Sequence, residues 1–148
     1  GNAGRISFEG DDASRDFIFP CDMTSSLSTG KYRIEFTGIS QFRISDYNKK
    51  DLKWFIDTRK PVGQTVIRSY DGNEKIKLFG RDFTSTVKKL LQDAERRGAF
   101  ELGVRKKDRV VISDDLGPIF VQGFGVAERA ACDQETNSAV RVDIFKDS

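Results

Sequence analysis

The 148-residue sequence predicts an α+β domain that is mainly β, either a twisted antiparallel sheet or a small β-sandwich with one helix packed on it. Two observations predict this fold class. Short stretches in which apolar and polar residues alternate recur along most of the chain. One longer segment alone has the apolar spacing of an amphipathic helix. Because no Pro-rich linker or internal repeat divides the sequence, we expect residues 1–148 to form a single domain.

Alternation predicts four strands in the first third of the chain, at 5–9, 15–19, 31–37 and 41–45. The clearest is 31–37, where Tyr32, Ile34 and Phe36 fall on one face and charged or polar residues on the other. Pro20 is expected to end the second strand, because proline cannot donate to a ladder. Gly38 is expected to mark a bend or bulge that joins 31–37 and 41–45 as halves of one long strand.

The remaining strands are expected at 52–57, 65–70, 75–79, 99–104, 109–113, 118–122 and 139–145. Two of the connections have the composition of hairpin turns. Asp71-Gly72-Asn73 is expected to join 65–70 to 75–79, because Asp-Gly supplies the positive-φ positions of a tight turn. The polar segment Lys106-Lys107-Asp108 is expected to join 99–104 to 109–113 in the same way.

One helix is predicted over Thr84–Arg97, from an apolar stripe of Val87, Leu90, Leu91 and Ala94. Asp82 or Thr84 is the expected N-cap, and Gly98 is expected to end the helix. A second, short helix is expected at 126–131, directly before Cys132.

Composition excludes several function classes. The chain has 25 basic and 23 acidic residues, a net charge of +2, whereas nucleic-acid-binding proteins usually have a clear basic excess. We therefore expect a protein or cell-envelope partner and no nucleic acid. No stretch approaches the ~20 apolar residues of a membrane span. No glycine-rich loop is followed by Lys-Ser or Lys-Thr, and no cofactor is expected.

The sequence contains no histidine, the commonest general base and metal ligand. Two pairs of acidic residues, Asp11-Asp12 and Asp114-Asp115, have the residue type for calcium binding or acid–base catalysis. We expect the second pair to be a polar loop between two strands instead. No catalytic, cofactor-binding or metal-ligating residue is therefore predicted.

Two cysteines, Cys21 and Cys132, lie far apart in the chain. A disulfide between them would close a loop of about 110 residues, which is worth roughly 4–5 kcal/mol on the chain-entropy model. Disulfides persist in oxidising compartments, so this pairing predicts a periplasmic or secreted protein. The alternative is two unpaired, buried thiols in a cytosolic protein.

Basic residues cluster on the predicted helix and on the turn that follows it: Lys88, Lys89, Arg96, Arg97, Arg105, Lys106, Lys107 and Arg109. If the helix end and the turn are neighbours, these residues form a positive patch. Such a patch suits an acidic partner, a lipid head group or a glycan phosphate. The alternative is an ordinary solvated surface.

Several short motifs between residues 52 and 132 resemble the periplasmic accessory proteins of bacterial type VI secretion loci, the VasI/TagO type. They include Phe55-Ile56-Asp57, Lys60-Pro61-Val62-Gly63, Leu102-Gly103-Val104-Arg105 and Ala130-Ala131-Cys132. An early cysteine and one after the last short helix are also similar to that family. The resemblance implies a periplasmic location and a disulfide, and it supplies no catalytic residues to transfer. The stretch Lys31–Tyr47 and the tail after Cys132 depart from it.

The function expected from the sequence is a non-catalytic periplasmic or secreted accessory or binding module, associated with a secretion system or the cell envelope. Two alternatives remain open. A hydrolase acting on cell-wall glycans through carboxylates requires two acids in one concave pocket, ~5–10 Å apart. A carrier of small ligands or lipids requires a dry cavity between sheet and helix.

Overall fold

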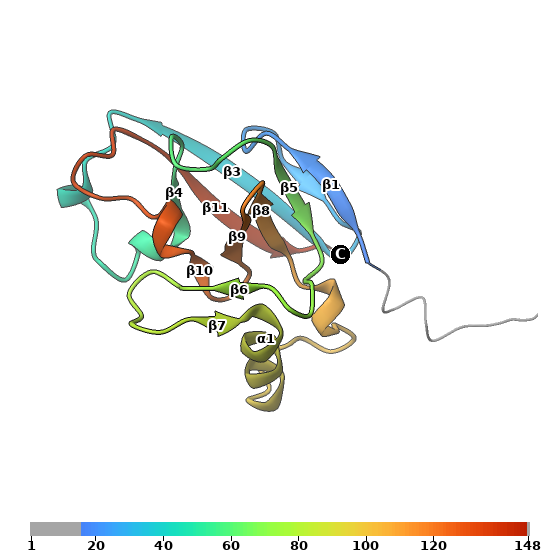
Figure 1. Cartoon of the computed structure of the whole chain (residues 1–148). Coiled ribbons are helices and arrows are strands. Elements are labelled where there is room, and N and C mark those ends of the chain that lie inside the picture. Colours follow the sequence, from blue (N-terminus) through green and yellow to red (C-terminus); the bar gives the residue numbers. More distant parts are fainter. Residues whose placement is uncertain (1–15, 148) are drawn as a thin grey trace, which may run out of the picture.

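The computed structural model describes residues 16–147 and confirms a mainly β member of the α+β class. Within these residues, eleven strands form antiparallel sheets and one α-helix packs beside them (Figure 1). The predicted strand at 5–9 and the acidic pair Asp11-Asp12 lie outside the described residues.

Three sheets organise the chain. The first has the order β2 (Leu27–Ser28), β3 (Tyr32–Ser40), β11 (Ser138–Lys146) and β4 (Phe55–Asp57). The second has the order β1 (Ile18–Cys21), β5 (Thr65–Arg68), β8 (Val111–Asp114), β9 (Gly117–Val121) and β10 (Gly125–Val126). The third is a ribbon of β6 (Lys75–Ile76) and β7 (Ser85–Thr86). The helical elements are α1 (Val87–Arg96) and the 3-10 turns η2 (Ile44–Asp46), η3 (Leu52–Trp54), η4 (Lys106–Asp108) and η5 (Glu128–Ala130).

The longest pairing joins β3 to β11 over nine residues, from Tyr32 opposite Lys146 to Ser40 opposite Ser138. Gly38 lies inside β3, opposite Val140, so the predicted bend at this glycine is wrong. The strand ends instead at Ser40, because Gln41 has a φ of 56°, which an extended strand does not tolerate. The predicted strand at 41–45 is accordingly replaced by the turn η2.

A core of aliphatic and aromatic side chains fills the space between the two larger sheets. The first sheet contributes Ile34, Ile56, Val140 and Val142, and the second contributes Ile67, Ile112, Ile119 and Phe120. Each such side chain stabilises the fold by roughly 1.5–3 kcal/mol when it is fully buried. The packing is that of a small sandwich, which was one of the two predicted architectures.

The second sheet is also covered on its other face, where α1 packs. Val111 and Val121 are opposite each other in the β8–β9 pair and contact the helix cluster, whereas the neighbouring pair Ile112 and Phe120 faces the inter-sheet core. Because both faces are buried, β8 and β9 read as continuous apolar runs instead of alternating ones. The helix cluster is completed by Val87, Leu90 and Leu91 of α1.

The helix begins later than predicted. Residues 85–86 pair with β6 as strand β7, and the Oγ1 of Thr86 accepts a hydrogen bond from the Lys89 N–H at 3.1 Å. Thr86 is therefore the N-cap in place of Asp82 or Thr84. The predicted helix at 126–131 is likewise shorter, since Val126 belongs to β10 and only Glu128–Ala130 form a 3-10 turn.

Both predicted hairpins are wrong in their pairing. β5 lies between β1 and β8, while β6 pairs with β7. The Asp71 turn itself forms, because the Glu74 carboxylate accepts the Asp71 N–H at 2.7 Å and pairs with Arg68. Residues 99–104 form no strand, and β8 pairs with β9 instead. Pro20 lies within β1, so the prediction that it ends the strand is wrong. Because β1 is an edge strand, it tolerates a residue without a backbone N–H donor.

The predicted disulfide is absent, because Cys21 and Cys132 are free thiols. Cys21 lies on the edge strand β1 and packs against the inter-sheet core. Cys132 lies in a separate cluster with Phe42 and Phe55 at the end of the first sheet. Burial raises the pKa of both thiols, that of Cys132 to about 12, so both stay protonated and weakly nucleophilic at neutral pH. The periplasmic location therefore stays a prediction that rests on the family resemblance.

We expect the native, non-reduced protein to carry two free thiols. Alkylation under native conditions should modify Cys21, which is partly exposed, and spare Cys132, which is buried, until the protein is unfolded. Intact-mass measurement after each step tests this. A protein that takes up no alkylating agent after unfolding without reductant would show that the two cysteines are bonded.

Gly125→Ala is expected to destabilise the fold by about 2–5 kcal/mol. Gly125 has a φ of 101°, and a Cβ there would lie 2.7 Å from the Lys53 carbonyl oxygen. Gly98→Ala is the matched control, since its φ is 71° and a Cβ there meets nothing within 4 Å. Chemical denaturation should show a loss of only about 1–2 kcal/mol for the control. Equal losses in the two variants would contradict the close approach of Lys53.

Candidate functional site

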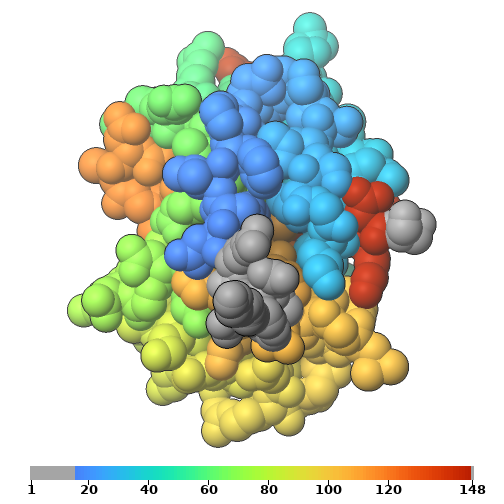
Figure 2. Space-filling view, turned by 90° about the vertical axis from the view of Figure 1, so that its right-hand side faces the viewer, coloured from blue at the N-terminus to red at the C-terminus, as the bar shows by residue number. Residues whose placement is uncertain are grey.

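The end of α1 and the turn η4 lie side by side, as the predicted positive patch requires (Figure 2). Lys106 of η4 pairs with Glu95 of α1, with 3.4 Å between Nζ and Oε1. Four of the predicted basic residues line one hollow of about 660 Å³ on this face: Lys88, Lys89, Arg96 and Lys106. Arg97 and Arg105 are exposed directly after α1 and directly before η4.

The other two predicted patch residues lie elsewhere. Lys107 donates to the Tyr70 carbonyl oxygen at 2.9 Å and pairs with Asp16 at 3.0 Å. Arg109 is buried and pairs with Glu101 at 3.0 Å, with its guanidinium 4.0 Å from the centre of the Phe100 ring. Lys107 and Arg109 are therefore paired with carboxylates and do not add free charge to the patch.

A second hollow, of about 530 Å³, brings together cations that sequence reasoning missed: Lys60, Lys75, Lys77 and Arg129. These residues come from three separate segments of the chain, so no local run of charge marks them in the sequence. Lys75 lies opposite Thr86 in the β6–β7 ribbon, and Thr86 lines the first hollow. The ribbon therefore connects the two hollows. We call the joined surface the basic belt; it comprises Lys60, Lys75, Lys77, Lys88, Lys89, Arg96, Arg97, Arg105, Lys106 and Arg129.

Some cations of the belt are neutralised by carboxylates. Lys60 pairs with Asp133, Lys77 with Glu128, Lys106 with Glu95, Arg96 with Asp93 and Arg129 with Asp114. Lys75, Lys88 and Lys89 have no acidic partner among residues 16–147. The belt therefore has a clear positive excess in a chain whose total charge is nearly balanced.

The pair of Asp114 and Arg129 anchors one side of the second hollow. The two guanidinium nitrogens donate to the two carboxylate oxygens at 2.7 and 2.9 Å, and the backbone N–H groups of Val62 and Leu116 donate as well. Burial raises the pKa of Asp114, but these hydrogen bonds outweigh it and lower the pKa to about 2. Asp114 is thus a structural acceptor at the end of β8, and the expected polar loop between the two strands is only a turn at Asp115-Leu116.

The rings of Phe83, Phe124 and Trp54 have cations over them, and of these three Phe83 is exposed. The Arg81 guanidinium lies 5.6 Å from the centre of the Phe83 ring and 5.7 Å from that of Phe124. Phe83 is 55% exposed, between β6 and β7. The Lys53 Nζ likewise lies 4.8 Å from the centre of the Trp54 ring.

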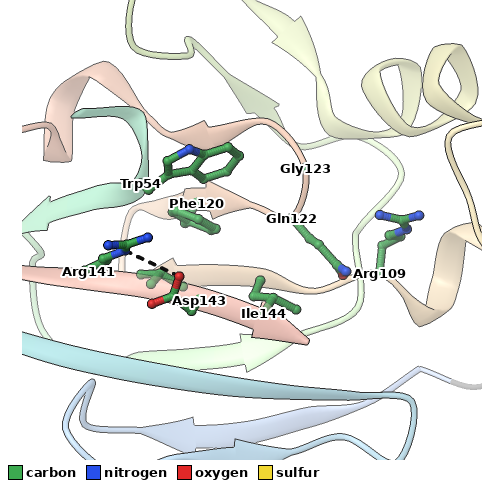
Figure 3. A pocket seen from close by; sticks show the side chains of 9 residues that line it. Trp54, Arg109, Phe120, Gln122, Gly123, Arg141, Asp143 and Ile144 are labelled. Atoms are coloured by element: carbon green, nitrogen blue, oxygen red, sulfur yellow. Dashed lines mark ion pairs between the residues drawn. The ribbon is translucent and has the colours of Figure 1, made fainter. Parts of the chain in front are cut away.

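A cavity of about 320 Å³ opens beside Trp54 (Figure 3). The rings of Trp54 and Phe120 form one wall, with their centres 6.2 Å apart. Arg141, Asp143 and Ile144 of β11 form the opposite wall, and Arg141 pairs with Asp143 at 3.4 Å. Sequence reasoning missed this cavity, because its residues are dispersed from position 54 to position 144.

Arg109 and Gln122 close the far end of this cavity. The Gln122 Oε1 accepts the Val110 N–H at 2.9 Å. Tyr32 donates its hydroxyl to Glu101 at 2.8 Å, and burial raises the pKa of that hydroxyl. Burial also raises the pKa of Glu101, but the hydrogen bond from Tyr32 and the charge of Arg109 outweigh it and lower the pKa. The Arg109 Nε is buried with no hydrogen-bond partner among the described residues.

Residues 16–147 contain no group of three or more side chains able to hold a metal ion. No helix among them is long and apolar enough to span a membrane. The acidic residues that line the two hollows of the belt and the cavity beside Trp54 are paired with cations: Glu128 with Lys77, Asp93 with Arg96, Glu95 with Lys106 and Asp143 with Arg141.

Comparison with known proteins identifies a similar fold but no family. No family model and no curated protein matches the sequence. A crystal structure of the TilS C-terminal domain matches with a TM-score of 0.67 and 11% sequence identity, over 90% of this chain and 99% of that one. This likeness shows the fold alone. It does not bear on the resemblance to type VI accessory proteins, which stays a prediction.

Asp114 is expected to make stability depend on acid pH. The lowered pKa of Asp114 stabilises the fold at pH values above about 4, which is the pKa of an aspartate in the unfolded chain. This contribution is lost as the pH falls toward about 2. We expect a loss of about 1–2 kcal/mol over that range, since Arg129 is partly exposed.

Asp114→Asn should lower the free energy of unfolding at pH 7. It should also flatten the dependence of this free energy on pH between pH 4 and 2, measured by denaturation at each pH. The control Asp115→Asn, at an exposed neighbour, should cost less than about 1 kcal/mol. An unchanged acid profile in Asp114→Asn would contradict the role of the pair.

Proposed function

We propose that this chain is a non-catalytic binding module whose partner is RNA, contacted through the basic belt. The observation that carries the proposal is the collection of eight cations from separate segments around two hollows, with Arg97 and Arg105 exposed after α1 and before η4. Phosphate groups of a nucleic-acid backbone are the polyanion that such a surface attracts.

The nearly neutral total charge does not argue against this partner. A surface potential depends on where charges lie, and it attracts a polyanion when cations are segregated from acids. Here Lys75, Lys88 and Lys89 have no ion-pair partner among residues 16–147, and Arg97 and Arg105 are exposed. The local excess supports binding that the sequence total does not indicate.

An exposed aromatic side chain near the belt also suits RNA. Unpaired bases of RNA stack on aromatic rings and on guanidinium planes. The exposed Phe83 with Arg81 offers such a stack close to the β6–β7 ribbon, and the half-buried Trp54 with Lys53 offers a second.

Two further observations support a binding role without chemistry of its own. The thiols of Cys21 and Cys132 have raised pKa values, and the carboxylates of the hollows are each engaged with a cation. The fold also occurs as the C-terminal domain of TilS, that is, as one domain of a longer protein. An accessory module attached to or acting with another protein is consistent with both.

Binding should be saturable for an RNA hairpin with a single-stranded 3′ extension and should weaken with salt. The logarithm of the RNA-binding constant should fall linearly with the logarithm of the salt concentration. In Lys88→Ala/Lys89→Ala the magnitude of this slope should be smaller by about 1.5–2, because each lost phosphate contact contributes somewhat less than one unit of slope. The matched control is Lys49→Ala/Lys50→Ala, an exposed lysine pair that lines neither hollow of the belt. Fluorescence anisotropy of labelled RNA at several salt concentrations measures both slopes.

Two results would contradict the proposal. One is equal salt slopes for the two double variants. The other is an absence of saturable RNA binding at low salt while the protein binds vesicles that contain anionic lipid, or an envelope protein as the type VI resemblance implies.

A further inference from the structure

We propose that the cavity beside Trp54 takes the base of one unpaired nucleotide. The inference rests on RNA as the partner and adds a site that the basic belt does not include. A cavity of about 320 Å³ is at the small end of the range for ligand pockets, which fits a single ring system and excludes a peptide or a lipid chain.

The walls of the cavity suit a flat ring. The Trp54 and Phe120 rings line one side, and the side chains of Val142 and Ile144 line the β11 side. A planar base between an aromatic and an aliphatic wall buries both of its faces. Stacking on an aromatic ring is favourable for every base, because every base has a π-face.

The polar groups of the cavity suit the edge of a base better than a phosphate. Asp143 accepts hydrogen bonds and would repel a phosphate, whereas Arg141 beside it donates. At the far end, Gln122 lines the cavity, and its side-chain amide carries N–H donors. A base edge carries both donors and acceptors, which matches this mixed set of groups.

The cavity lies within reach of the belt. Arg109 directly follows η4, whose Lys106 lines the first hollow of the belt. Gly123 on the rim precedes Phe124, which contacts the Arg81 guanidinium beside β6 and β7. In the proposed complex, a strand bound along the belt places one nucleotide, turned out of the stack, in the cavity.

Trp54 is the only tryptophan of the chain and reports occupancy without a label. We would follow its indole N–H resonance and its fluorescence while adding adenosine or uridine 5′-monophosphate. Both nucleotides should shift the resonance saturably, whereas ribose 5-phosphate and inorganic phosphate should not. Shifts of equal size with ribose 5-phosphate would show recognition of phosphate alone and would overturn the inference.

Two variants test the cavity itself. Ile144→Phe fills it and should weaken nucleotide binding about tenfold or more, the size of a lost stacking contact. Arg141→Ala removes only an exposed donor and should weaken binding severalfold while the fold is retained. Arg33→Ala is the matched control, because Arg33 pairs with Glu35 on β3 with the same two-residue spacing and lines no part of the cavity.

The outcomes separate this inference from the proposed function. If the RNA hairpin binds with the expected salt dependence but neither nucleotide shifts the Trp54 resonance, the base site is wrong and the belt stands. If neither the hairpin nor a nucleotide binds, both are wrong. If Arg141→Ala and Arg33→Ala bind nucleotides equally well, the cavity is not the site.

Discussion

The burial of the β8–β9 hairpin on both faces is the constraint on which the rest of the structure depends. Its two strands lie in the middle of the five-stranded sheet, with the first sheet on one side and α1 on the other. Alternate residues of one short hairpin therefore join two hydrophobic clusters. A strand buried on both faces cannot slip by one residue without exchanging its two sets of contacts.

This hairpin also positions both candidate binding surfaces. Arg109 and Gln122 lie at its open end, where they close the cavity beside Trp54. Asp114 lies at its turn, where it holds Arg129 against the second hollow of the basic belt. The cavity and the second hollow are thus attached to opposite ends of this buried hairpin. Exposed cations and rings are placed by a rigid scaffold, which limits the entropy lost when a partner binds.

The parts of the fold that sequence patterns predicted are those set by local periodicity. The strands β3, β9 and β11 and the helix α1 were placed within a few residues, because alternation or a helical stripe identifies a buried face. The hairpin pairings failed for a different reason. Asp71-Gly72 predicts a turn, and the turn forms, but the partner of β5 is chosen by long-range packing between β1 and β8.

The candidate site shows the same division. The run of cations at Lys88-Lys89 and Arg96-Arg97 was visible in the sequence, and α1 brings it next to η4. Burial removed Arg109 from that surface, and tertiary contacts added Lys75 to it. The predicted disulfide failed because distance along the chain says nothing about whether two thiols meet, and Cys21 and Cys132 pack in different clusters.

The most direct test of RNA binding by the basic belt is a hydrogen-exchange comparison of the free protein with its complex with the RNA hairpin. Protection should increase over β6, β7, α1 and η4, that is, over residues 75–108, and stay unchanged over β1 and β2. Protection confined to β1 and β2, or no change over α1 at saturating RNA, would contradict the assignment of the belt as the binding surface.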